Sequence, residues 1–170
     1  VLAQRFEEGE RWIRRALEIR LRIFGEKHPS TGANRLALAD LFRYSGRLER
    51  ARSEYEMALR SVDYEPGSFD FEKLLDPDLA LRILLERAHL AIAMSGSNAM
   101  PIREALAWID EALALTDALR AGSRRLGSKR ARQRQRLLYD LALRGIDLAV
   151  ERTDDSSWID RAFAYSEGHK

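Results

Sequence analysis

The chain has 170 residues, of which 45% are hydrophobic and 33% are charged. This balance excludes an intrinsically disordered chain and is typical of a globular protein built from amphipathic helices. The absence of cysteine excludes disulfides, thiolate metal sites and a cysteine nucleophile from these residues. No apolar run approaches the roughly 20 residues that span a bilayer, so we expect a cytoplasmic protein with no contact to a membrane.

Apolar residues recur at helical spacing along the chain, and no segment keeps the period of two that is typical of a strand. Glycines and prolines divide the pattern into about seven helices. The expected ranges are 3–24, a second helix with Ser30 or Thr31 as N-cap that ends at 44–46, then 48–63, 77–96, 101–120, 129–152 and a last helix from Ser156 or Ser157. Short connections between consecutive helices indicate antiparallel hairpins, so we expect an all-α fold of stacked helix pairs.

Small and aromatic residues recur at regular places in residues 36–59. Small side chains such as Ala39 and Ala58 allow two helices to approach closely. Phe42 and Tyr55 would fill the space between them, and Gly46 supplies the left-handed conformation that ends the first helix. This arrangement resembles a tetratricopeptide repeat. The resemblance implies antiparallel hairpins stacked in a right-handed superhelix that binds a protein or peptide in a concave groove.

The resemblance implies a single repeat domain. We expect it to be part of a longer protein, because the sequence has no initiator methionine and ends without a helix stop signal. Residues 1–24 resemble the second helix of a repeat, and residues 30–63 form the best-matched repeat. Residues 77–121 and 129–170 resemble degenerate repeats, the latter truncated. The segment from Gly25 to Pro29 is similar to the Gly-x-x-His-Pro linker of kinesin-light-chain-type repeats, which implies a structural role for His28 at the junction between repeats.

The closing segment, WIDRAFAYSEGHK, resembles the helix that joins tetratricopeptide arrays to a caspase-like (CHAT) peptidase domain. The matching residues are Ala162, Phe163, Ser166, Glu167 and Lys170. This resemblance implies that the chain is a regulatory arm of a protease. The catalytic histidine and cysteine of such a domain would lie outside this sequence.

No group of residues predicts catalysis, a metal or another cofactor. His28, His89 and His169 share no metal-ligand spacing with one another or with carboxylates. The chain also lacks a glycine-rich phosphate loop and a nucleophile with a neighbouring base. We therefore expect no enzymatic activity within this chain. The tryptophans are expected to be buried between hairpins rather than to form a stacking platform for bases; they are Trp12, Trp108 and Trp158.

The first helix of each hairpin would line the concave face of a repeat array, so the second, fourth and sixth helices would form a groove for a peptide. The outward positions expected on the second helix are Ala33, Leu36, Asp40, Arg43 and Tyr44. The last four are candidate partner-binding residues. Asp40 stands where carboxylate-clamping repeats carry Lys or Asn, which disfavours recognition of a C-terminal carboxylate.

A basic segment, residues 120–136, carries eight Lys or Arg residues and no acid. On a helical wheel, Arg130 and Arg132 lie on opposite flanks of the apolar stripe of the sixth helix. Arg134 lies close to the stripe and Arg136 lies behind it. Exposed cations in the first turns of a helix oppose its dipole, at a cost of about 0.3–1 kcal/mol each. The segment is therefore a solvated helix start, a surface for an acidic protein partner, or a nucleic-acid site.

From these patterns we expect a protein–protein interaction scaffold whose partner is a protein or peptide, and a partner that binds at residues 120–136 would be acidic. The same surface includes the candidate residues Arg130, Arg132, Arg134 and Arg136. The alternative is a nucleic-acid-binding helical repeat that uses this basic segment, supported by arginines of the first helix.

Overall fold

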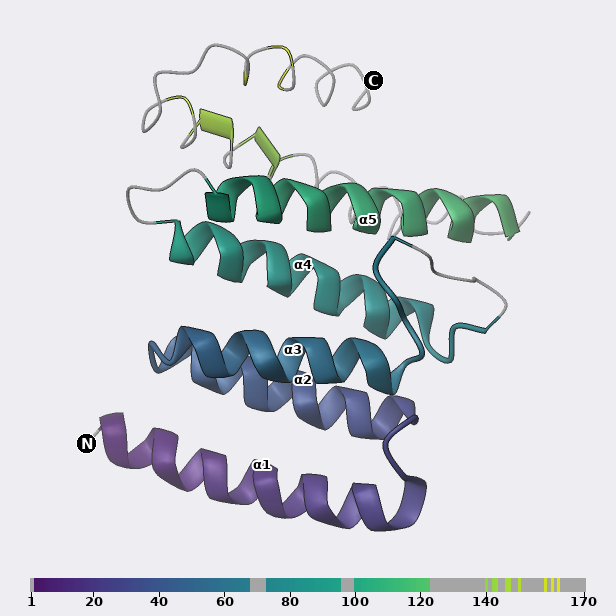
Figure 1. Cartoon of the computed structure of the whole chain (residues 1–170). Helices are drawn as coiled ribbons and strands as arrows, with labels where there is room; N and C mark the ends of the chain where they lie inside the picture. Colours follow the sequence, from purple (N-terminus) through teal and green to yellow (C-terminus); the bar gives the residue numbers. More distant parts are fainter. Residues whose placement is uncertain are drawn as a thin grey trace. The chain divides into compact units, whose positions relative to one another are not determined.

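The computed structural model describes residues 2–67, 73–95 and 100–122, together with scattered positions between residues 140 and 162. Five helices and no strand occur in this part of the chain (Figure 1): α1 (Leu2–Phe24), α2 (Pro29–Tyr44), α3 (Leu48–Ser61), α4 (Pro77–Met94) and α5 (Met100–Gly122). The all-α class is confirmed there. No helix of the described part is long and apolar enough to cross a bilayer. The expected sixth and seventh helices fall largely outside the described residues.

The start of α2 differs from the predicted one. Ser30 or Thr31 was the expected N-cap, but His28 holds this position in extended conformation, and its Nδ1 accepts a hydrogen bond from the Ser30 backbone N–H at 3.1 Å. Pro29 follows in the first turn, where a missing N–H is tolerated. The imidazole also stacks on the Phe24 ring, with 4.3 Å between centroids. His28 therefore has a structural role at the α1–α2 junction.

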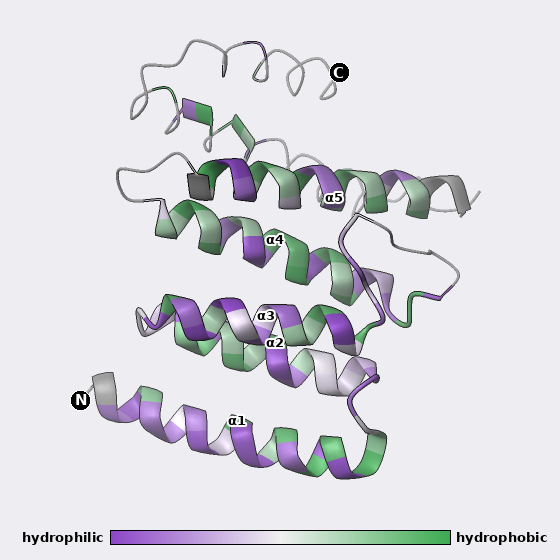
Figure 2. Ribbon diagram, in the orientation of Figure 1, coloured by the Kyte–Doolittle hydropathy of each residue, from purple (hydrophilic) through white to green (hydrophobic). Residues whose placement is uncertain are grey.

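The chain divides into two compact units, residues 1–86 and 87–170, and the boundary falls inside α4. In the first unit, α1 and α3 both pack against α2. Figure 2 shows hydrophilic and hydrophobic residues alternating along α3, as expected of a helix with one buried face. The residues predicted to pair α2 with α3 are all buried, which confirms that part of the repeat pattern: Ala39, Phe42, Ala51, Tyr55, Ala58 and Leu59.

Gly32 marks a close approach of α2 to its neighbours. A Cβ atom at this position would lie 3.3 Å from the Ala58 carbonyl oxygen, 3.3 Å from Ser61 Cβ and 3.4 Å from Leu79 Cδ2. The absence of a side chain thus sets the spacing between α2 and α3. Gly46, in the turn between the same helices, has a φ of 76°. This is the left-handed conformation expected for it from the sequence.

In the second unit, the buried residues of α5 recur every three or four positions, as its sequence predicts. They are Ile102, Ala105, Leu106, Ile109, Ala112 and Leu115. Trp108, which lies in the same helix just before Ile109, is half-buried. The Arg87 guanidinium carbon lies 4.5 Å from the centroid of its ring, and the indole N–H donates to Glu104 at 3.4 Å.

The close approach at Gly32 gives the first testable prediction. Gly32→Val should lower the free energy of unfolding by about 1–3 kcal/mol, because the new side chain would crowd the Ala58 carbonyl oxygen and the Ser61 side chain. Ala33→Val introduces the same β-branched residue at the neighbouring exposed position, where it costs only helix propensity, below about 1 kcal/mol. Urea unfolding followed by circular dichroism compares the two variants. Equal destabilisation would contradict a tight α2–α3 contact at Gly32.

A candidate partner-binding surface on α2

Two of the four candidate residues on α2, Asp40 and Arg43, lie in one network of polar contacts. Arg43 donates from Nη2 to Glu86 Oε2 at 3.0 Å and from Nε to the Tyr55 hydroxyl at 3.3 Å. The Tyr55 hydroxyl donates to Asp40 Oδ1 at 2.7 Å, and Arg82 Nη2 lies 3.9 Å from Asp40 Oδ2. These five residues, termed the α2 polar cluster, connect α2 to α3 and to the first half of α4.

Tyr44, the third candidate, extends this surface, whereas Leu36 does not. Tyr44 is 68% exposed, and the Arg43 guanidinium carbon lies 4.4 Å from the centroid of its ring. Leu36 is only 1% exposed, so its expected outward position is wrong. The reason is that α2 is covered by α1 as well as by α3. The exposed side of α2 is therefore narrower than a single hairpin indicates. It contains Ala33, as expected, and also Ala37.

Burial shifts the titration of two groups in the α2 polar cluster. Desolvation and the nearby Glu86 raise the pKa of Asp40, although the hydrogen bond from Tyr55 and the cations Arg43 and Arg82 act in the opposite direction. Burial and the bond to Asp40 also raise the pKa of Tyr55 far above its usual value. Tyr55 therefore stays protonated and keeps donating to Asp40.

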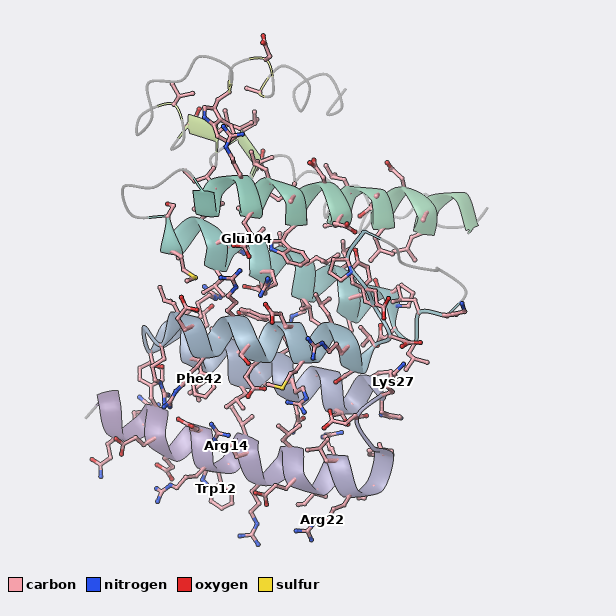
Figure 3. The ribbon with its side chains drawn as sticks, viewed as in Figure 1. Trp12, Arg14, Arg22, Lys27, Phe42 and Glu104 are labelled. Carbon is pink, nitrogen blue, oxygen red and sulfur yellow. The ribbon has the colours of Figure 1, made fainter. Side chains whose placement is uncertain are left out.

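A second exposed surface lies on α1. Trp12, Ile19 and Ile23 are 65%, 50% and 66% exposed, and their spacing of seven and four residues places them on one side of the helix. Figure 3 shows Trp12 on the side of α1 that faces away from α2. We term these residues the outer face of α1.

The exposure of Trp12 contradicts its expected burial. The error arises because α1 is apolar on two sides, and α2 covers only the side that contains Leu17, which is 7% exposed. The other two tryptophans behave differently. Trp158 is buried as expected, at 2% exposure, and Trp108 is half-buried beneath Arg87.

The basic candidates Arg130, Arg132, Arg134 and Arg136 lie outside the described residues, as does His169. Ala142, which lies within the range of the predicted sixth helix, is buried. Within the described part of the chain, no group of three or more histidine or acidic residues is placed to hold a metal ion. Of the predicted partner-binding residues, the structure brings together Asp40, Arg43 and Tyr44. The sequence did not predict Tyr55, Arg82 and Glu86 as members of this site.

Comparison with known proteins gives one match. A family model described as tetratricopeptide repeat matches residues 1–62, which contain α1, α2 and α3. The match supports repeats of the tetratricopeptide type in the part of the chain where the packing of small and aromatic residues is as predicted. No curated protein and no solved structure matches the chain.

The hydrogen bond between Tyr55 and Asp40 gives the second prediction. Asp40→Asn should be at least as stable as the parent at neutral pH, because the amide oxygen still accepts from Tyr55 and the partly buried charge is gone. Asp40→Ala should lose about 1–3 kcal/mol, because the buried hydroxyl loses its acceptor.

The pH dependence of the same variants has a definite sign. The pKa of Asp40 is higher in the folded state than in the unfolded one, so the folded state binds the proton more tightly. The parent therefore gains stability relative to Asp40→Asn as the pH falls through the folded pKa. Thermal unfolding over a pH series measures the difference. If Asp40→Asn is as unstable as Asp40→Ala at neutral pH, the charge rather than the hydrogen bond is essential.

Proposed function

We propose that this chain is a protein–protein interaction scaffold of the tetratricopeptide-repeat type. The observation that carries the proposal is the family match over residues 1–62. Repeats of this type generally bind protein partners on surfaces formed by adjacent helices. In this chain, the exposed ring of Tyr44 lies beside Arg43, whose guanidinium group is held by hydrogen bonds. An exposed aromatic ring next to an ordered charge is suited to binding a protein partner.

The proposed contact surface consists of Tyr44 and the α2 polar cluster. Hydrogen bonds and ion pairs already fix Asp40 and Arg43, so a partner that binds there loses little affinity to the ordering of side chains. Exposed tyrosines are frequent binding hot spots, because a large rigid ring buries much area at a low entropic cost. The Arg82 side chain is 65% exposed and adds an accessible cation to the same surface.

A regulatory role in a larger protein is the second part of the proposal. It is supported by the resemblance of residues 158–170 to the helix that precedes caspase-like (CHAT) peptidase domains. Trp158, at the start of this segment, is buried, and Ala162 is half-buried. In this proposal, a partner that binds the repeats would control a protease domain carried by the same protein.

Binding to the α2 surface is tested by substitution of Tyr44. The partner is first captured with the intact chain by chemical cross-linking, and its affinity is then measured by titration calorimetry. Tyr44→Ala should weaken binding at least about tenfold, as expected for loss of an aromatic hot spot. Trp12→Ala removes an exposed aromatic ring from α1 and serves as the matched control. A loss of affinity only with Trp12→Ala would contradict the assignment to α2.

The nucleic-acid alternative rests on the eight cations of residues 120–136, and salt dependence separates it from protein binding. Binding to RNA or DNA would weaken steeply with salt, with a slope of roughly 0.7–0.9 in log K per phosphate contacted. We expect no such binding to depend on the basic segment. Replacing Arg130, Arg132, Arg134 and Arg136 by Ala should therefore leave any affinity for oligonucleotides unchanged. A large drop in the salt slope of this variant would support the alternative instead.

A further inference from the structure

Three arginines converge on the ring of Phe42, which is 1% exposed. Their guanidinium carbons lie 5.7 Å (Arg14), 4.5 Å (Arg47) and 6.0 Å (Arg50) from the ring centroid. Arg14 belongs to α1, Arg47 precedes α3 and Arg50 lies in its first turn; Figure 3 labels Arg14 and Phe42. Cations within about 6 Å of a ring face are attracted to it. The ring thus gathers three like charges, termed the Phe42 arginine cluster.

Glu10 neutralises part of this charge. Arg14 Nε donates to Glu10 Oε1 at 2.9 Å, and Arg47 Nη1 donates to Glu10 Oε2 at 2.5 Å. Burial alone would raise the pKa of Glu10, but the hydrogen bonds from Arg47 and Arg14 outweigh it and lower the pKa. Glu10 is therefore a firmly ionised carboxylate that two arginines share.

Arg50 has no such counter-ion among the described residues. The Arg50 side chain is exposed, and its guanidinium group lies over the Phe42 ring. The charge of Arg14 also acts on Glu54. The Glu54 carboxylate, however, already forms an ion pair with Arg35, with 3.3 Å between Arg35 Nη1 and Glu54 Oε2. The cluster thus combines three guanidinium groups with one dedicated carboxylate, and Arg50 presents its donors to solvent.

We propose that the Phe42 arginine cluster binds an acidic side chain of a protein partner. The proposal rests on the interaction function proposed above and specifies the chemistry of the partner. A guanidinium is planar and binds a carboxylate through two parallel hydrogen bonds. A carboxylate seated at Arg50 would supply its missing counter-ion and would offset the repulsion among the three arginines.

The surroundings of the cluster favour a protein acid over a nucleic acid. Binding to a phosphate backbone needs cations spread along many successive phosphates, whereas these three guanidinium groups share one ring. Exposed acids also stand close in sequence to its members, with Glu7 and Glu8 before Glu10 and Glu49 beside Arg50. The positive charge is therefore confined to a spot that suits one or two carboxylates.

The test measures binding of a labelled oligoglutamate peptide to the whole chain by fluorescence anisotropy at low salt. Arg50→Ala should weaken binding about threefold or more, because a partly exposed ion pair is lost. Glu10→Gln should strengthen it by a similar factor, because two arginines lose their internal carboxylate. Arg50 is exposed, so its replacement leaves the fold intact, and circular dichroism of each variant verifies this.

Two control variants distinguish binding at the Phe42 arginine cluster from a nonspecific effect of changing the charge of the chain. Arg60→Ala removes an exposed arginine from the same helix as Arg50, and Glu18→Gln removes an exposed acid from the same helix as Glu10. Neither should change the affinity. Equal shifts within either pair, or no binding by the parent chain, would overturn the proposal.

An oligouridylate probe completes the test. If its affinity, rather than that of oligoglutamate, follows Arg50→Ala and Glu10→Gln, the ligand is a nucleic acid and the assignment to a protein acid is wrong. Because the peptide is defined in advance, the result does not depend on capturing a cellular partner. Failure of this inference is therefore distinguishable from failure of the proposed scaffold function.

Discussion

The packing of α2 between α1 and α3 is the constraint on which the rest of the first unit depends. Small residues at the contacts bring the helices close together. The larger polar side chains of α2 therefore lie at the borders of these contacts, where they form hydrogen bonds and ion pairs with neighbouring segments. Arg35 is an example. It is 7% exposed and bonds to Glu54 at 3.3 Å and to Glu26 at 2.9 Å. A buried cation without such partners would be strongly destabilising, so this ion-pair network links the helices.

The helices were predictable because their boundaries depend on local residues. Gly25, Gly46 and Pro77 stop or start helices by their own backbone preferences, and the described helices follow the predicted order. The exposure of Trp12 and the burial of Leu36 were not predictable in the same way. Which side of a helix is covered depends on all of its neighbours, and those neighbours are far away in the sequence.

The same reasoning applies to the candidate sites. Asp40 and Arg43 could be identified on α2 because they share one helix face, and the structure joins them through Tyr55. The Phe42 arginine cluster gave no sequence signal, because Glu10 and Arg47 are 37 residues apart. In both sites the charged side chains contact an aromatic residue of the α2–α3 interface. This residue is Tyr55 in the α2 polar cluster and Phe42 in the Phe42 arginine cluster. The residues that hold the repeat together thus also fix the orientation of the charges at its surface.

The outer face of α1 has a consequence for the behaviour of concentrated solutions. It combines exposed Trp12, Ile19 and Ile23 with nearby exposed arginines such as Arg15 and Arg22. At low ionic strength, repulsion between arginines on different copies opposes contact between the apolar side chains. Salt shortens the range of that repulsion to about 10 Å at 0.1 M and leaves the apolar attraction in place. We therefore expect added salt to favour contacts between copies through this face.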